Sequence, residues 1–97
     1  EIATEEIKQM MDVCVESYLY AKEAFFEKNS EKAVKVIEKE TLADDLEVRL
    51  RNKHIKRLAN NQCNAETGIF YLDTLVSMER ISDHARNIAE EIMNPEN

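Results

Sequence analysis

Residues 78–90 read MERISDHARNIAE and place two carboxylates on the apolar side of an expected helix. At about 100° per residue, Glu79 and Asp83 lie about 40° apart on a helical wheel. The same sector holds the apolar side chains of Leu75 and Val76. Two carboxylates four residues apart repel each other, and burying each is costly unless a cation lies nearby. The segment therefore predicts such a cation, either a metal ion or an arginine.

The segment 31–60 repeats this arrangement with a second pair of carboxylates. Its apolar residues cover a wide sector of the wheel, as expected of a helix that contacts two neighbours. Glu40 and Asp44 lie inside that sector, about 40° apart and close to Ile37 and Val48. Two Glu-x-x-x-Asp pairs inside apolar faces are harder to explain as isolated surface charges than one pair.

Three amphipathic helices, over residues 4–28, 31–60 and 65–93, account for nearly the whole chain. One glycine, one proline and no tryptophan in 97 residues leave few turn residues for a sheet, so an all-α fold is expected. Because the connectors are short, neighbouring helices should run antiparallel, which predicts a single domain, 1–97, with an up-down-up three-helix bundle. The inward face of the first helix is predicted from its apolar spacing: Ile7, Met11, Cys14, Tyr18, Ala21 and Phe25.

Polar residues mark the predicted helix boundaries. Thr4, Ser30 and Asn64 each precede a helical pattern, and each has a side-chain oxygen that can accept a hydrogen bond from the first helical turn. We therefore expect these three residues to be N-caps. The third helix should end at Asn94-Pro95, because the residue before proline is driven out of the helical region.

The composition excludes several classes of function. A net charge of −7 disfavours a nucleic-acid partner, because affinity for phosphate backbones comes largely from clustered Lys and Arg. Cys14 and Cys63 form neither a C-x-x-C pair nor a dense disulfide framework, which fits a reduced, cytosolic setting. No apolar run reaches the length of about 18 residues that a membrane helix needs, so a soluble chain is expected. The start at Glu1 rather than Met suggests a piece of a longer protein, which could hold membrane segments.

The carboxylates have two interpretations. If the second and third helices pack together, the carboxylates face one another and share hard or borderline metal ions, which carboxylate oxygens suit. Alternatively, Arg51 and Arg86 neutralise them, since both lie near the same angular sectors. The spacing also offers the ion pairs Glu47–Arg51 and Asp83–Arg86. Spacing leaves both interpretations open, and the first assigns four metal ligands: Glu40, Asp44, Glu79 and Asp83.

The sequence gives little support to catalysis. A ferritin-type di-iron site needs Glu-x-x-His on two helices, and no glutamate here has a histidine three residues later. His84 lies opposite Leu75 on the wheel and should face solvent, whereas His54 lies nearer the inner sector and is best explained as a satisfied histidine between helices. Neither a nucleophile–base pair nor a glycine-rich phosphate loop occurs. We therefore expect a protein that is not an enzyme.

The three helices offer more apolar side chains than one bundle needs. Leu19, Tyr20, Phe26 and Phe70 fall outside the predicted seams. Apolar residues left on a surface commonly pack against another chain. A homodimer, or a second bundle in a longer parent chain, is therefore expected.

Residues 78–90 resemble the signature helix of the PhoU family of phosphate-regulatory helical bundles. Residues 54–58, 61–64 and 71–73 further resemble the PhoU-like domain at the C-terminus of bacterial sodium-phosphate cotransporters. This resemblance implies a cytosolic three-helix bundle whose Glu-x-x-x-Asp motifs bind metal clusters of iron or zinc, with Mn or Mg as further candidates. It also assigns these motifs to the two pairs found above, Glu40 with Asp44 and Glu79 with Asp83.

The resemblance implies a regulatory domain attached to a phosphate transporter, with the transporter's own membrane domain as a partner. It leaves open whether phosphate itself contacts the domain. Two features depart from the family pattern, because members usually carry two tandem bundles and frequently have glycine at the position of Ser82. The alternatives are a stand-alone PhoU-like phosphate regulator and a structural helical adaptor that binds another protein and no metal.

Overall fold

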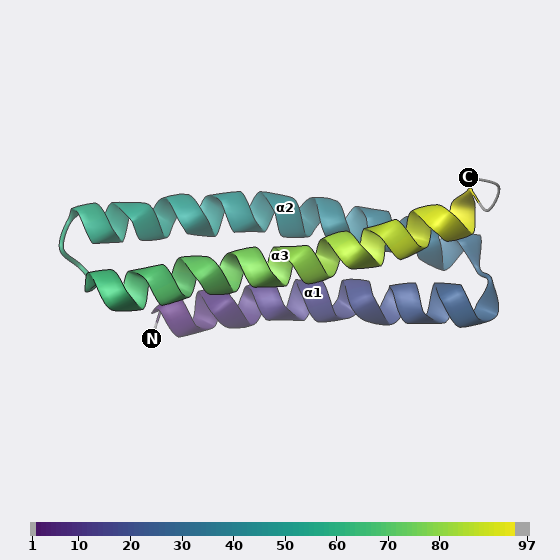
Figure 1. Cartoon of the computed structure of the whole chain (residues 1–97), viewed down its shortest axis with the longest axis horizontal. Helices are drawn as coiled ribbons and strands as arrows, with labels where there is room; N and C mark the ends of the chain where they lie inside the picture. Colours follow the sequence, from purple (N-terminus) through teal and green to yellow (C-terminus); the bar gives the residue numbers. More distant parts are fainter. Residues whose placement is uncertain (1, 95–97) are drawn as a thin grey trace.

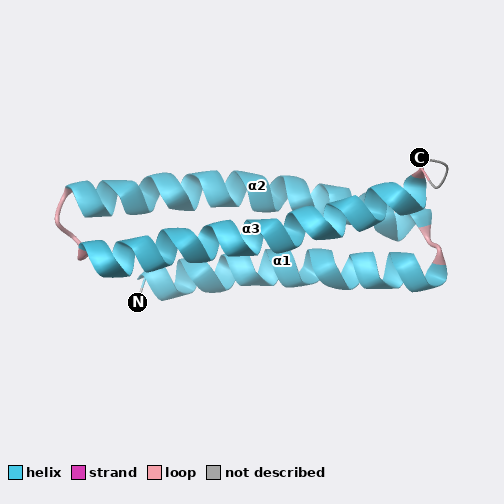
Figure 2. Cartoon of the chain, viewed as in Figure 1, coloured by secondary structure: helices cyan, strands magenta, loops and turns pink. Residues whose placement is uncertain are grey.

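A computed structural model describes residues 2–94 and contains three long helices joined by two short connectors (Figure 1). They are α1 (Ile2–Glu27), α2 (Ser30–Ala59) and α3 (Ala65–Met93). The chain runs up, down and up, so that the start of α1 lies at the same end as the α2–α3 connector (Figures 1 and 2). The predicted all-α, three-helix antiparallel bundle is confirmed. None of the described helices combines the length and apolar character that crossing a membrane requires.

The first connector differs from its prediction by one residue. The side chain of Asn29, rather than Ser30, caps α2 by accepting a hydrogen bond from the backbone N–H of Lys32 at 3.2 Å. Lys28 adopts the left-handed conformation with φ 51°, and the Asn29 N–H returns to the Ala24 carbonyl at 3.0 Å. This pattern closes a helix C-terminus and is usually formed with glycine at the left-handed position.

The second connector closes α2 in the same manner. Asn61 adopts φ 56°, and the Gln62 N–H donates to the Arg57 carbonyl at 2.8 Å. Asn64 then accepts a hydrogen bond from the Thr67 N–H at 2.8 Å, which confirms it as the N-cap of α3.

The helix ends agree with the predictions for α3 and differ for α1. The predicted bounds of α3, Ala65 to Met93, match the structure. Thr4 is not a cap, because α1 already begins at Ile2 and Thr4 lies inside its first turn. Pro95, the predicted stop of the last helix, lies outside the described residues.

The buried face of α1 is displaced by about one residue from the predicted stripe. Cys14 and Ala21 are buried as expected, but Met11, Tyr18 and Phe25 are about half exposed. The apolar pattern was misleading because two inward positions hold polar residues. The buried side chains of α1 are Glu6, Met10, Cys14, Ser17, Ala21 and Ala24.

Small side chains hold the three helices close together. Near the α2–α3 connector the helices touch at Gly68, where an added Cβ would lie 2.5 Å from Leu58 Cδ2. At the other end of the bundle the core consists mainly of alanines, whereas the end nearer Gly68 has a larger apolar core. The larger core contains Met10, Cys14, Ala43, Leu46, Leu50, Tyr71 and Leu75.

Candidate metal site

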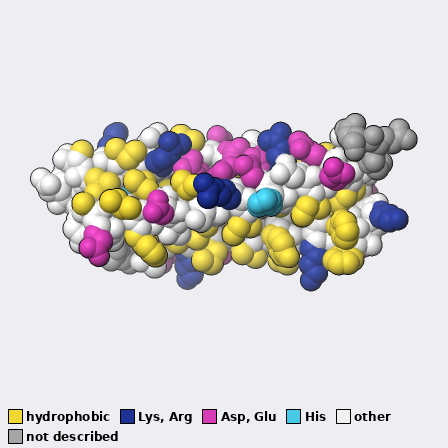
Figure 3. Space-filling model, viewed as in Figure 1, with side chains coloured by type: hydrophobic (Ala, Val, Ile, Leu, Met, Phe, Trp, Pro, Cys, Tyr) yellow, Lys and Arg dark blue, Asp and Glu magenta, His cyan; other side chains and the backbone are white. Residues whose placement is uncertain are grey.

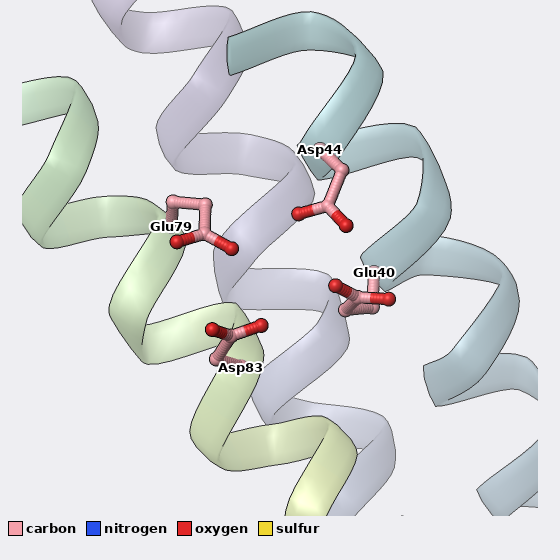
Figure 4. A group of neighbouring side chains, drawn as sticks. All are labelled: Glu40, Asp44, Glu79 and Asp83. Atoms are coloured by element: carbon pink, nitrogen blue, oxygen red, sulfur yellow. The ribbon is translucent and has the colours of Figure 1, made fainter. Parts of the chain in front are cut away.

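The four predicted carboxylates come together in the middle of the α2–α3 seam (Figures 3 and 4). Because α2 and α3 are antiparallel, Glu40 lies beside Asp83 and Asp44 lies beside Glu79, with all four side chains pointing into one space (Figure 4). One oxygen from each carboxylate lies within 4.8 Å of the others. The sequence prediction of two facing Glu-x-x-x-Asp pairs therefore holds as geometry, and the role of these residues as metal ligands stays a prediction.

Burial decreases across this carboxylate cluster towards the solvent. Glu40 is only 2% exposed, Asp44 and Glu79 are half-buried, and Asp83 is exposed. An ion could therefore reach the cluster from the side of Asp83 and keep some water ligands.

Burial and mutual repulsion raise the pKa values of two carboxyl groups in the cluster. Burial is the largest cause that raises the pKa of Glu40 to about 7, followed by a hydrogen bond and repulsion from Asp44. Burial also raises the pKa of Glu79 to about 7, together with a hydrogen bond to Asp44 and the charge of Asp83. The charge of Arg86 acts on Glu40 in the opposite direction and is too weak to cancel these effects. Near neutral pH, Glu40 and Glu79 are therefore partly protonated, and a metal ion would have to displace these protons.

The arginine interpretation is only partly right. Arg51 pairs with Glu47 through two hydrogen bonds, of 3.0 and 3.1 Å, as the spacing predicted, and makes no contact with the cluster. Arg86 does reach the cluster, with Nη1 donating to Glu40 Oε1 at 3.1 Å. Its second partner is Glu90 at 3.2 Å, and the expected pair with Asp83 is not formed.

A second buried polar network, which was not predicted from the sequence, joins all three helices at the end of the bundle that contains the α2–α3 connector. Glu6 is 6% exposed and accepts hydrogen bonds from Arg57 Nη2 at 2.5 Å and from the Tyr71 hydroxyl at 2.7 Å. Lys53 adds an ion pair at 3.4 Å. Burial opposes ionisation of Glu6, but these partners together lower its pKa below the ordinary value. The sequence signal that could have revealed this network is the spacing of Glu6, which precedes the buried Met10 by four residues and therefore lies on the same face of α1.

His54 belongs to this second network. It is 2% exposed, its ring stacks on Tyr71 with centroids 3.8 Å apart, and its Nδ1 accepts a hydrogen bond from Arg57 Nε at 3.1 Å. Burial lowers the pKa of His54, and the neutral ring places Nε2 3.6 Å from Cys63 Sγ. The prediction of a satisfied histidine between helices is confirmed, and His84 is exposed as expected.

The donor set of the cluster determines the ions it could hold. All four candidate ligands are carboxylates, and no histidine or cysteine joins the group within residues 2–94. Oxygen-only sites suit hard cations such as Mg²⁺ and Mn²⁺, and iron and zinc also accept carboxylate ligands. Fold and site thus define a class of three-helix bundle that carries, between two helices, a carboxylate cluster that could hold a metal ion.

Comparison with known proteins agrees with this class. A family model described as the PhoU domain matches residues 7–92, and the chain belongs to the PhoU family. The chain is 26% identical over 88 residues to "Phosphate-specific transport system accessory protein PhoU homolog 1" of Thermotoga maritima. That alignment covers 91% of this chain and only 38% of the length of the relative. No solved structure matches.

Family membership also supports the expectation about catalysis. The PhoU domain is a regulatory domain and not an enzyme. The absence of a nucleophile–base pair in the sequence is consistent with that assignment.

Proposed function

We propose that this chain is a regulatory domain of phosphate transport whose state depends on a metal cation bound at the carboxylate cluster. The regulatory role is supported by membership of the PhoU family and by similarity to the Thermotoga relative, which is named as an accessory protein of phosphate-specific transport. Binding of the cation is supported by the geometry of the four carboxylates.

The observation that carries the metal proposal is the lack of compensation for these charges. Within residues 2–94, no basic side chain pairs with Asp44, Glu79 or Asp83, and Glu40 has a single basic partner, Arg86. Carboxylates that serve a structural role inside a bundle are normally paired, because desolvating an unpaired charge costs several kcal/mol. A cation bridging α2 and α3 would remove this cost. It would also stiffen the seam between the two helices, and a partner protein could distinguish the metal-bound form from the metal-free form by this change.

The comparisons favour an accessory regulator over a domain built into a transporter. The matched relative is named as an accessory protein of a phosphate-specific transport system. Attachment to a sodium-phosphate cotransporter, on the cytoplasmic side of the membrane, remains the second form of the proposal and rests on the resemblance of residues 54–58, 61–64 and 71–73. The sequence upstream of Glu1 in the parent gene separates the two forms. Transmembrane helices there support the cotransporter, and their absence supports the accessory regulator.

Metal binding can be tested by isothermal titration calorimetry on chelator-treated protein with Mn²⁺, Fe²⁺, Zn²⁺ and Mg²⁺ at pH 8. We expect saturable binding of at least one ion to the wild type and its loss in the double variant Glu79→Gln with Asp83→Asn. The matched control is Asp45→Asn with Asp73→Asn, which removes the same charge from exposed, unpaired positions of α2 and α3. Binding that is lost equally in both double variants, or absent from the wild type, contradicts the site.

We further propose that the outer α1–α3 seam packs against a second three-helix bundle, supplied by another copy of this chain or by a longer parent. Met11, Tyr18 and Phe25 are exposed on α1 at intervals of seven residues. On α3, Ile81 and Ile88 are exposed with the same spacing. Apolar residues repeated every seven residues are typical of a surface that receives another helix.

Two grooves extend this seam towards its ends. One, of about 490 Å³, is lined by Phe25 and Ile88, and the other, of about 260 Å³, is lined by Ile7 and Phe70. Hydrophobic side chains are visible along this face (Figure 3). The Thermotoga relative is long enough to hold a second bundle, since the matched part is 38% of it. If the cluster binds no metal, this surface supports the alternative function, a structural helical adaptor.

A further inference from the structure

Arg86 is placed where it can compete with a metal ion for Glu40. Its Nη1 donates to Glu40 Oε1 across the α2–α3 seam at 3.1 Å, and its Nε donates to Glu90 Oε2 on its own helix at 3.2 Å. The Glu40 side chain is 3% exposed, whereas the side chains of Arg86 and Glu90 are 44% and 48% exposed. In the described part of the chain, Arg86 is the one basic side chain that contacts any of the four clustered carboxylates.

The two contacts of Arg86 differ in whether they occupy a carboxylate oxygen of the cluster. The contact with Glu40 uses one oxygen of the most buried carboxylate in the cluster, and a metal ion on that oxygen would lie next to the positive charge of the guanidinium, so the two cations compete for it. The contact with Glu90 is an i,i+4 pair on the solvent side of α3 and does not involve the cluster. Arg86 can therefore release Glu40 and retain a carboxylate partner.

We propose that Arg86 is the built-in competitor of the cation and sets the affinity of the site. Without metal it holds Glu40, and when an ion enters the cluster its guanidinium moves to Glu90 alone. The inference rests on the proposed function, because it requires that the cluster bind a cation. Since only molecules with a released Glu40 can bind the ion fully, the apparent dissociation constant rises by the inverse of their fraction. A bound ion and the Arg86–Glu40 contact would thus weaken each other.

The proposal predicts that two substitutions change the Kd for the ion in opposite directions. Arg86→Gln removes the competitor and should lower the Kd for the ion about tenfold. Glu90→Gln removes the alternative partner, leaves Arg86 more strongly on Glu40, and should raise the Kd. Each has a neighbouring control that makes the same charge change without touching Arg86 or the cluster. The controls are Arg80→Gln and Glu91→Gln, both at exposed positions of α3.

The experiment is calorimetric titration of the chelator-treated 97-residue chain with Mn²⁺ at pH 8, repeated with Fe²⁺, Zn²⁺ and Mg²⁺. The melting temperature of each metal-free variant is the second readout. We expect tighter binding and a lower metal-free melting temperature for Arg86→Gln, weaker binding for Glu90→Gln, and smaller changes for both controls. If the wild type binds an ion and Arg86→Gln binds it equally or more weakly, the proposed role of Arg86 is overturned and the metal site is still supported. If neither the wild type nor Arg86→Gln binds any of the ions, the metal site and the role of Arg86 both fail.

Discussion

Glu6 and Glu40 are both nearly buried glutamates, and their surroundings give them opposite properties. Glu6 is surrounded by donors from Arg57, Tyr71 and Lys53, which lower its pKa. Glu40 has one donor and three carboxylate neighbours, and its pKa is raised to about 7. A buried glutamate therefore stabilises the bundle through its donors in one place, and in the other it is a carboxylate that we propose as a metal ligand.

Replacing Glu6 should destabilise the bundle. Glu6→Gln leaves the guanidinium of Arg57, whose side chain is 20% exposed, without its carboxylate. Removing one partner of a buried ion pair costs about 3 kcal/mol. We expect a loss of this size in the free energy of unfolding measured by urea denaturation. Glu5→Gln, at the exposed neighbouring position, should change it by less than about 0.5 kcal/mol. Equal losses in both variants would contradict the assigned role of Glu6.

The raised pKa values of Glu40 and Glu79 make the metal-free protein less stable at alkaline pH. The folded state binds these protons more tightly than the unfolded state, whose carboxyl groups have ordinary pKa values near 4.5. Unfolding therefore releases protons, and stability falls as pH rises through the folded pKa of about 7. We expect a decrease of about 1 kcal/mol for each of the two groups, or about 2 kcal/mol in total, between pH 6.5 and 8 in urea denaturation.

That pH interval separates the cluster from the other shifted groups. Glu6, with its lowered pKa, contributes stability that is lost only in acid, below the ordinary glutamate pKa of 4.5. The lowered pKa of His54 destabilises the folded state only as pH falls through and below the ordinary histidine value of 6.5. The variant Glu40→Gln with Glu79→Gln should show no decrease between pH 6.5 and 8. A wild-type stability that stays flat or rises there contradicts the assignment.

Among the helices, α3 was predicted best because its boundaries have unambiguous local signals. Asn64 supplies a side-chain cap, and the apolar spacing continues without interruption from there. The inward face of α1 was predicted wrongly because Glu6 and Ser17 point inward, whereas Tyr18 and Phe25 lie on the outer seam. Apolar periodicity identifies a helix, but it cannot tell which of two apolar faces meets the core when polar partners arrive from other helices.

The connector between α1 and α2 contains a strained residue, Lys28, and a substitution by glycine should relieve the strain. Lys28 adopts a left-handed conformation that costs a residue with a Cβ about 1 kcal/mol relative to glycine. We expect Lys28→Gly to raise the free energy of unfolding by about 1 kcal/mol, measured by thermal denaturation. Lys22→Gly, in the exposed middle of α1, should lower it by a similar amount. A loss of stability in both variants would contradict the C-terminal motif described for α1.

For the molecule as a whole, the outer seam predicts self-association. We expect sedimentation equilibrium at high micromolar concentration to show a dimer for the wild type. The double variant Tyr18→Glu with Ile81→Glu should be a monomer with unchanged helix content. The control Val34→Glu with Leu42→Glu alters exposed apolar residues of α2 and should remain a dimer. A monomeric wild type would contradict the proposal and leave the seam as a surface for a different partner.

The sequence predicted which carboxylates meet, because two i,i+4 pairs on antiparallel helices can align only along one shared seam. It could not predict their counter-ion. Arg51 and Arg86 have similar angular positions, and only the packed structure shows that Arg51 turns to Glu47 while Arg86 reaches Glu40. Long flexible side chains choose among several carboxylates within reach, so their partners depend on three-dimensional distances.

The most direct test of the unpaired-carboxylate interpretation is the stability of metal-free protein carrying Glu79→Gln and Asp83→Asn, measured by urea denaturation at pH 8. Neither residue has a basic partner within residues 2–94, so the variant removes repulsion without stranding a guanidinium. We expect a free energy of unfolding equal to or higher than that of the wild type and of the control Asp45→Asn with Asp73→Asn. A loss of more than about 1 kcal/mol relative to that control would show that the carboxylates are structural, and would contradict a site held open for a cation.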